Sequence, residues 1–249
     1  AQEVLEAMAA STGEVRLIAD ANCVGFGHQL LILSLAFRRR AIPLTWTWIN
    51  CPKGHSSAVK QLALLAHVRS LVPNGIPVLL VGDSEFGAMV VLEQLDTWKW
   101  YYVLRQRASH GTQLEGQTDW NTFDSLIERP GQSRWEEGAL LTRRSAYPTN
   151  LLAYWGPGEE RPWFLATNLP RKRDALRAYR RRMWIEEMFG DMKGHGFDLE
   201  KTHLRHFQRL SRLTLAVVFL YTWLVSVGTR AVKRGKRRLV DRNDRRDLS

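Results

Sequence analysis

The stretch VRLIADANCVGFGHQLLILSLAFRRRAIPLTWTW, residues 15–48, contains three consecutive strand-like segments. A first apolar run ends in Asp20, and a second run spans 30–37. Over residues 42–48, bulky side chains alternate with proline and threonine, and this period of two is typical of strands. The three arginines at 38–40 suit a solvated turn between the last two segments. The stretch therefore predicts three neighbouring strands at the start of a sheet.

The segments that follow alternate between helical and strand-like patterns. In chain order they are a helix over 56–72, a strand over 77–82 that is followed by Asp83, a helix over 87–98 and a strand over 100–104. Three strands followed by helix, strand, helix and strand predict a mixed α/β layer fold.

The second half of the chain changes character. Residues 108–162 are rich in Gly, Pro, Ser, Thr and Trp and contain short strand-like pieces, which indicates a β-rich insertion. Strand character returns at 163–167. From Asp174 the pattern is helical to about Gly228, with a break expected near 194–196 because two glycines stand there.

Composition and charge narrow the class of protein. The 249 residues are 45% hydrophobic and 24% charged, which excludes wholesale disorder. The net charge of +11 is uneven: residues 171–249 hold 21 Lys and Arg against 9 Asp and Glu, whereas residues 1–170 hold 15 against 16. This asymmetry indicates a polyanionic partner, most often nucleic acid. Two cysteines are too few for a disulfide framework or a zinc site, and a reducing compartment is expected.

We expect no membrane partner. The sequence opens without the basic start and long apolar run of a secretory signal. The longest apolar stretch, residues 213–227, is short for a membrane-spanning helix, which needs about 20 residues. We therefore expect a buried core helix there.

A row of functional residue types runs along the long predicted helix. Tyr179, Arg182, Glu186 and Lys193 are 3, 4 and 7 residues apart, and on a continuous α-helix they share an arc of about 60°. A carboxylate between an arginine and a lysine suits a DNA backbone that lies across metal ions. A solvated face with ion pairs between neighbouring turns explains the same pattern equally well.

The residues also resemble a known family. The spacing Y-x2-R-x3-E-x6-K matches the YREK motif of bacterial insertion-sequence DDE transposases of the insertion sequence four group. WIEEMFGDMKGHGFDLEKTHLR looks like the third catalytic block of that family, VLLVGDSEFG like the block around its second aspartate, and RLIADAN like the first block. The resemblance extends roughly from Val15 to Leu204.

The resemblance implies a fold and a division of the chain. The fold is α/β, a ribonuclease H-like mixed sheet flanked by helices, with the first and fourth strands adjacent and a β-rich insertion before the last catalytic helix. The implied parts are 1–107 as the first part of the catalytic domain, 108–162 as the insertion, 163–228 as the catalytic helix and the C-terminal helices that complete the core, and 229–249 as a basic tail.

The resemblance also implies a mechanism. Asp20, Asp83 and Glu186 are the expected catalytic and metal-binding residues, and they hold two Mg²⁺ or Mn²⁺ ions. Water cuts the DNA strand at the element's end, and the freed 3′-hydroxyl then attacks another phosphodiester. Because an aspartate after a strand is commonly a turn residue or a helix cap, both aspartates also have a purely structural reading.

Further implied contacts concern DNA. Tyr179, Arg182 and Lys193 are expected to bind phosphates near the cut. One tryptophan of the insertion could stack on an extruded base, although packing explains each of them as well; the candidates are Trp120, Trp135 and Trp155. The expected partners are element ends and target DNA, with a homodimer in the DNA complex, and the expected place is the bacterial cytoplasm at the nucleoid.

Two other functions stay open at this point. One is a DNA-binding remnant that no longer cuts, because the N-terminal DNA-recognition region expected of the family is missing. The other is a ribonuclease H-like nuclease that hydrolyses branched or hybrid nucleic acid. Strand-transfer products would separate the transposase from both.

Overall fold

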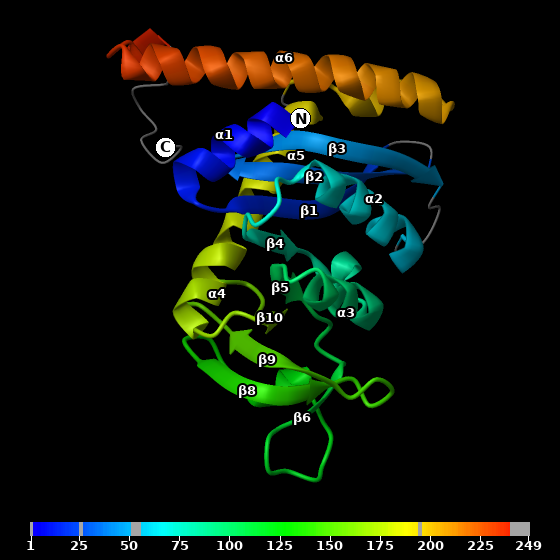
Figure 1. Cartoon of the computed structure of the whole chain (residues 1–249), viewed down its shortest axis with the longest axis vertical. Coiled ribbons are helices and arrows are strands. Elements are labelled where there is room, and N and C mark those ends of the chain that lie inside the picture. The colour runs from blue at the N-terminus through cyan, green and yellow to red at the C-terminus, as the bar shows by residue number, and fades with distance from the viewer. Residues whose placement is uncertain (1, 25–26, 51–55, 194–195, 240–249) are drawn as a thin grey trace. The chain divides into compact units, whose positions relative to one another are not determined.

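The computed structural model describes residues 2–24, 27–50, 56–193 and 196–239. The chain forms two compact units, Ala1–Thr202 and His203–Ser249, which are described separately (Figure 1). The predicted segment 163–228 is thus divided between the two units. Residues 194–195, in the predicted break, and 240–249, in the predicted basic tail, lie outside the described residues.

The first unit is built on one sheet. Its strands are β1 (Val15–Val24), β2 (His28–Phe37), β3 (Arg40–Asn50), β4 (Val78–Gly82), β5 (Tyr101–Arg105), β6 (Gly111–Gln113), β7 (Asn121–Thr122), β8 (Ser133–Leu141), β9 (Tyr147–Tyr154) and β10 (Trp163–Thr167). They lie in the order β3-β2-β1-β4-β5-β10-β9-β8-β6-β7.

Strand directions in this sheet are mixed. β2 is antiparallel to both β1 and β3, whereas β4 is parallel to both β1 and β5. The three neighbouring N-terminal strands and the pairing of the first strand with the fourth are confirmed. The parallel pair needs a crossover connection, and the helix between β3 and β4 provides it.

The region predicted as an insertion extends the same sheet. Residues 108–162 contain β6 to β9 and a short 3₁₀ turn, η2 (Phe123–Leu126). β9 pairs antiparallel with β10, and β10 pairs antiparallel with β5. The edge of β5 is therefore paired with β10, and the later strands belong to the same sheet rather than to a separate one.

Helices cover this sheet. They are α1 (Gln2–Thr12), α2 (Ala58–Leu71), α3 (Met89–Thr97), α4 (Lys172–Tyr179) and α5 (Met183–Met192), with 3₁₀ turns η1 (Ser84–Phe86), η3 (Arg180–Arg182) and η4 (Leu199–Lys201). Sequence analysis did not predict α1. The sequence feature that could have predicted it is a set of three apolar residues at helical spacing, Leu5, Met8 and Ala9, whose side chains are buried in the structure.

The two faces of β1 carry different neighbours. Leu17 and Ala19 belong to a core cluster that includes side chains of α1, α2 and α3. Because side chains alternate along a strand, Asp20 points to the opposite face. On that face α5 packs against β1 and β3, and the Ser34 hydroxyl of β2 lies 3.6 Å from the Met188 sulfur of α5. The sheet therefore separates the core cluster from Asp20 and α5.

The helical character expected from Asp174 is confirmed as far as Met192, but these residues do not form one α-helix. α4 begins at Lys172, and the 3₁₀ turn η3 separates it from α5, which ends at Met192. A 3₁₀ turn advances about 120° per residue where an α-helix advances about 100°. Three such residues turn the following side chains by about 60° more in total, so Tyr179 and Glu186 lie about 40° apart around the axis instead of about 20° and still share one side. Lys193 follows the helix as its C-cap.

The second unit contains α6 (Phe207–Lys233) and the short turn η5 (Arg237–Leu239). α6 confirms the predicted helix, but the prediction that it is buried is wrong: Phe219 is 68% exposed and Trp223 is 59% exposed. Apolar residues occur on every side of α6, and a helix buries only the sides that another element covers.

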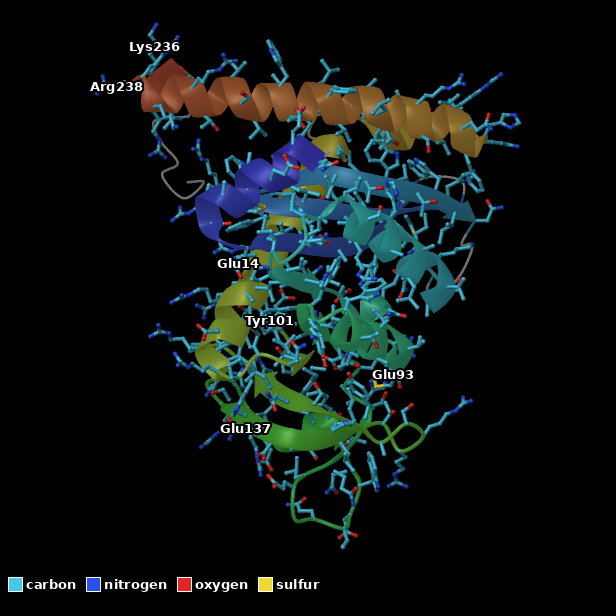
Figure 2. All side chains as sticks on the ribbon, viewed as in Figure 1. Glu14, Glu93, Tyr101, Glu137, Lys236 and Arg238 are labelled. Carbon is cyan, nitrogen blue, oxygen red and sulfur yellow. The ribbon has the colours of Figure 1, made fainter. Side chains whose placement is uncertain are left out.

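The length and ends of α6 also differ from the sequence expectation. It has 27 residues with a mean hydropathy of 1.7 over its most apolar window, so length and composition make it a candidate membrane span. The length argument against a span was wrong because the helix extends well beyond the apolar stretch. Helix also replaces the start of the expected tail, and the exposed side chains of Lys236 and Arg238 project beyond it (Figure 2).

Candidate catalytic site

Two aspartates stand side by side where β1 and β4 are paired. The parallel register places Ala19 opposite Gly82, so the next residues are Asp20, which lies inside β1 rather than at its expected end, and Asp83, which directly follows β4. Asp20 is 7% exposed and accepts a hydrogen bond of 2.7 Å from the Ala21 N–H. Two residues far apart in sequence are therefore neighbours because of strand order alone.

The turn after β4 holds Asp83 in place. The Asp83 carbonyl accepts a hydrogen bond of 2.9 Å from the Phe86 N–H, and the Phe86 side chain is fully buried. A Cβ added to Gly87 would lie 2.5 Å from the Arg105 carbonyl oxygen on β5, so a glycine permits this close approach. The Oδ1 atom of Asp83 is buried, and it has no hydrogen-bond partner among the described residues.

Arg182 joins Asp20 to Glu186. Its Nη1 donates to the Asp20 Oδ2 at 2.8 Å, and its Nη2 lies 3.0 Å from the Glu186 Oε1. The side chains of Arg182 and Asp20 are 11% and 9% exposed, while the Glu186 side chain is 49% exposed. The fork geometry of a guanidinium suits such contacts with two carboxylates. We expected Arg182 to bind phosphates, and in the structure its partners are carboxylates.

Burial dominates the electrostatics of this cluster. It raises the pKa of Asp20 from 3.8 to about 7, because the lowering effect of Arg182 does not compensate for lost hydration, and Glu186 and Asp83 raise it further. Burial alone would lower the pKa of Arg182, but the neighbouring Tyr179 and Asp20 hold it above its ordinary value. The site therefore concentrates negative charge around one buried cation.

Tyr179 lies in the same cluster. Its side chain is 2% exposed, and its ring packs edge-on against Trp163 with centroids 5.2 Å apart. Its hydroxyl finds no hydrogen-bond partner in the part of the chain that the structure describes. Burial raises the pKa of Tyr179 to about 12. Lys193 ends α5, and its backbone N–H donates to the Phe189 carbonyl at 3.0 Å. Their expected phosphate contacts stay predictions.

The residues fit a divalent cation in chemistry, although not in their present arrangement. Three carboxylates offer the hard oxygen ligands that Mg²⁺ and Mn²⁺ prefer. The unpartnered oxygen of Asp83 and the poorly hydrated carboxyl of Asp20 are groups that a cation would satisfy. Within the described ranges, however, no three His, Cys, Asp or Glu side chains are grouped to hold one ion. Arg182 is the cation that bridges Asp20 and Glu186.

Sequence reasoning missed Glu85. Its carboxylate accepts hydrogen bonds from Gln29 on β2, at 3.0 and 3.1 Å, and from the Ser56 N–H before α2, at 2.8 Å. The Glu85 carbonyl also accepts from Gln61 at 2.8 Å. Glu85 therefore ties the turn after Asp83 to two other elements. Its position two residues after an aspartate was the available signal.

The tryptophans of the expected insertion are half-buried. The indole N–H of Trp135 donates to Glu137 at 2.9 Å, and that of Trp155 donates to the Glu159 carbonyl at 2.9 Å. Trp155 also packs against the core cluster. Stacking on a base stays a prediction for each of them, Trp120 included.

Fold and cluster together define an α/β domain whose acidic residues meet at a pair of parallel strands. The sequence matches the transposase DDE domain family over residues 47–223, which is more than half of the chain. The chain belongs to this family. The matched segment includes Asp83, Arg182 and Glu186 and begins after Asp20.

Other comparisons are more distant. No curated protein matches the chain. The chain is similar to a solved piggyBac transposase synaptic complex with hairpin DNA, with a TM-score of 0.47 and 11% identity. That match covers 71% of this chain and 40% of the other, so the chain spans less than half of the length of that protein.

Proposed function

We propose that the chain is the catalytic region of a DNA transposase with a ribonuclease H-like core, which cuts DNA at the ends of an insertion sequence and joins the freed end to another strand. The single observation that carries the proposal is the juxtaposition of Asp20 and Asp83 by the β1–β4 register, with Glu186 connected to Asp20 through Arg182. Membership of the transposase DDE domain family supports the same chemistry.

The proposed roles follow from the surroundings of each residue. Asp20, Asp83 and Glu186 would hold two Mg²⁺ or Mn²⁺ ions, which when bound supply an activated water and stabilise the leaving oxygen. Asp83 has an unpartnered oxygen ready to accept a ligand. Glu186 is exposed enough to change its rotamer and leave Arg182. The Nη2 group of Arg182 then becomes available to donate a charge-assisted hydrogen bond to a DNA phosphate.

The test is cleavage of a plasmid that carries the ends of the element. We expect nicks with 3′-hydroxyl ends, and then joined products, with Mg²⁺ or Mn²⁺ and none with EDTA. Glu186→Gln should abolish cutting and leave DNA affinity within a few-fold. Glu187→Gln is the matched control, because Glu187 is the next residue on α5 and pairs instead with Arg40 at 2.9 Å.

The outcomes separate the three functions. Cutting and joining by the wild type and by Glu187→Gln, but not by Glu186→Gln or Asp83→Asn, supports a transposase. Tight DNA binding without cutting supports an inactive remnant, and hydrolysis without joined products supports a nuclease. Circular dichroism checks that each inactive variant is folded; loss of folding in Glu186→Gln counts against a catalytic role.

A metal-binding measurement is independent of turnover. Mn²⁺ should raise the unfolding temperature of the wild type, because an ion bound to the folded state stabilises it. The increase should vanish in Asp83→Asn and persist in Glu187→Gln. An equal increase in all three proteins would remove Asp83 from the proposed ligands.

A further inference from the structure

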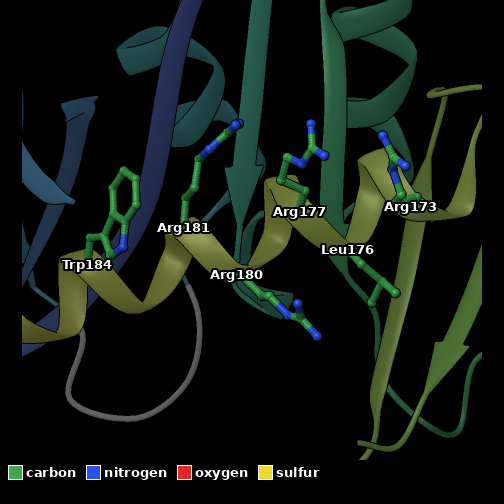
Figure 3. A pocket seen from close by; sticks show the side chains of 6 residues that line it. All are labelled: Arg173, Leu176, Arg177, Arg180, Arg181 and Trp184. Atoms are coloured by element: carbon green, nitrogen blue, oxygen red, sulfur yellow. The ribbon is translucent and has the colours of Figure 1, made fainter. Parts of the chain in front are cut away.

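A row of arginines runs along α4 and the 3₁₀ turn η3, beside the acidic cluster. An open pocket is lined by Arg173, Leu176, Arg177, Arg180, Arg181 and Trp184. Figure 3 shows Arg173, Arg177, Arg181 and Trp184 pointing to one side of the helix, while Arg180 and Leu176 point to the other. We call Arg173, Arg177 and Arg181 the arginine row. Sequence analysis noted the basic charge of this region without singling out these residues.

The arginine row is open to a ligand. Arg173 and Arg177 are exposed, and Arg181 is half-buried. In the part of the chain that the structure describes, none of the three makes an ion pair with a carboxylate. By contrast, Arg180 contributes a hydrogen bond of 3.4 Å to the Tyr154 hydroxyl on the other side. Within the described residues the row is therefore a set of cations that have no direct ion-pair partner.

The charges of the row also disfavour one another. Burial lowers the pKa of Arg181, and the like charges of Arg16 and Arg177 lower it further, while Glu14 acts in the opposite direction. Glu14 is engaged with Arg16 at 2.5 Å. An anion bound on the row would relieve this repulsion, because guanidinium groups hold phosphate oxygens with charge-assisted hydrogen bonds.

The spacing of the row suits a polymer of phosphates. Arg173 and Arg177 are four residues apart in α4, or about 6 Å along its axis, and the step to Arg181 in the 3₁₀ turn is slightly longer, about 7 Å. Successive phosphates of one DNA strand advance about 3.4 Å along the duplex axis, so one helical step matches about two phosphates. A nucleic-acid backbone fits this row better than a single small anion, which would engage one position.

The row also begins at the acidic cluster. Arg181 directly precedes Arg182, which contacts Asp20 and Glu186. We propose that the arginine row is a track for the phosphate backbone of the DNA that leads away from the cleavage site. The proposal rests on the proposed function for its choice of partner, and it adds a binding surface that the motif residues Tyr179 and Lys193 do not provide.

The test measures DNA binding in EDTA, where cleavage plays no part. A short fluorescein-labelled duplex is titrated by fluorescence anisotropy at several salt concentrations between about 50 and 200 mM. Each phosphate contact contributes about 0.9 to the slope of log affinity against log salt. The triple variant Arg173→Gln, Arg177→Gln, Arg181→Gln should therefore flatten the slope by about 2.7.

The matched control removes the same charge elsewhere. Arg129, Arg144 and Arg161 are exposed and lie outside α4, so their triple change to Gln should leave the slope near the wild-type value. If the row variant is not folded by circular dichroism, the double variant of the exposed Arg173 and Arg177 replaces it, with an expected flattening of about 1.8.

The outcomes are decisive for this surface alone. An unchanged slope in the row variant overturns the proposal, and so does an equal flattening in the control, which would reflect net charge. A flattened slope together with a plasmid that is never cut keeps the binding track and refutes the proposed catalysis. If the wild type cuts the plasmid but the salt slope of the row variant is unchanged, the binding track is refuted and the proposed catalysis is not.

Discussion

Replacing Asp20 by Asn should change how stability depends on pH. Burial raises the pKa of Asp20 from 3.8 to about 7 in the folded protein. Between about pH 4 and about pH 7 the folded state keeps this proton while the unfolded chain has lost it. Unfolding then releases a proton, so rising pH favours the unfolded state. Below pH 4 both states are protonated, and above pH 7 neither is.

The size of the effect follows from the same values. A difference of about 3 in pKa, at about 1.4 kcal/mol each, corresponds to about 4 kcal/mol. The wild-type free energy of unfolding should therefore fall by about 4 kcal/mol relative to Asp20→Asn between about pH 4 and about pH 7. The attraction of Arg182 is already included in the pKa of Asp20, and Arg182 itself stays charged in both proteins throughout this range.

Urea unfolding in EDTA, followed by circular dichroism from acid to slightly alkaline pH, measures this difference. Other titrating groups are common to both proteins and cancel in the comparison. An exposed carboxylate supplies the control: Asp119→Asn should keep the wild-type pH dependence. A constant difference between wild type and Asp20→Asn over the whole range would refute the reasoning, because it would mean that Arg182 keeps the carboxylate ionised.

Three further predictions concern single contacts, each measured by urea unfolding. Arg182→Gln should lower the free energy of unfolding by about 3 kcal/mol at pH 8, because it leaves a buried carboxylate unpaired. Arg40→Gln, which removes an exposed ion pair, should lower it by less than about 1 kcal/mol. Equal losses in the two variants would contradict this prediction. Tyr179→Phe removes a buried hydroxyl without a partner and should stabilise the protein by about 1 kcal/mol, and a clear loss of stability would reveal a hidden partner. Gly87→Ala should lower the free energy of unfolding by about 1–3 kcal/mol, because its Cβ meets a backbone oxygen at 2.5 Å. Gly228→Ala, whose Cβ has nothing within 4 Å, should leave stability unchanged or raise it. A loss of stability in both variants would reject this explanation.

Local patterns in the sequence were sufficient for most elements of the first unit. The alternation at 42–48 and the apolar runs ending in Asp20 and Asp83 predicted strands that the structure has. Helix ends were less predictable. The turn η3 replaces α-helix at three consecutive arginines, and no helix-breaking residue announces it. Arg182, the last residue of this turn, contacts Asp20, which is 162 residues away in the sequence, and no local pattern encodes such a contact.

The sequence by itself determined which residue types this protein can use for chemistry: a motif with one glutamate, two aspartates that follow apolar runs, and a surplus of basic residues in the last third. Only the tertiary structure decided where the charges meet. Strand order brings Asp20 beside Asp83, and packing places Arg182 between Asp20 and Glu186, while among the described residues Arg173, Arg177 and Arg181 have no ion-pair partner. The reason is that periodicity is set by neighbours along the chain, whereas electrostatic pairing depends on distances that only the packed sheet and helices establish.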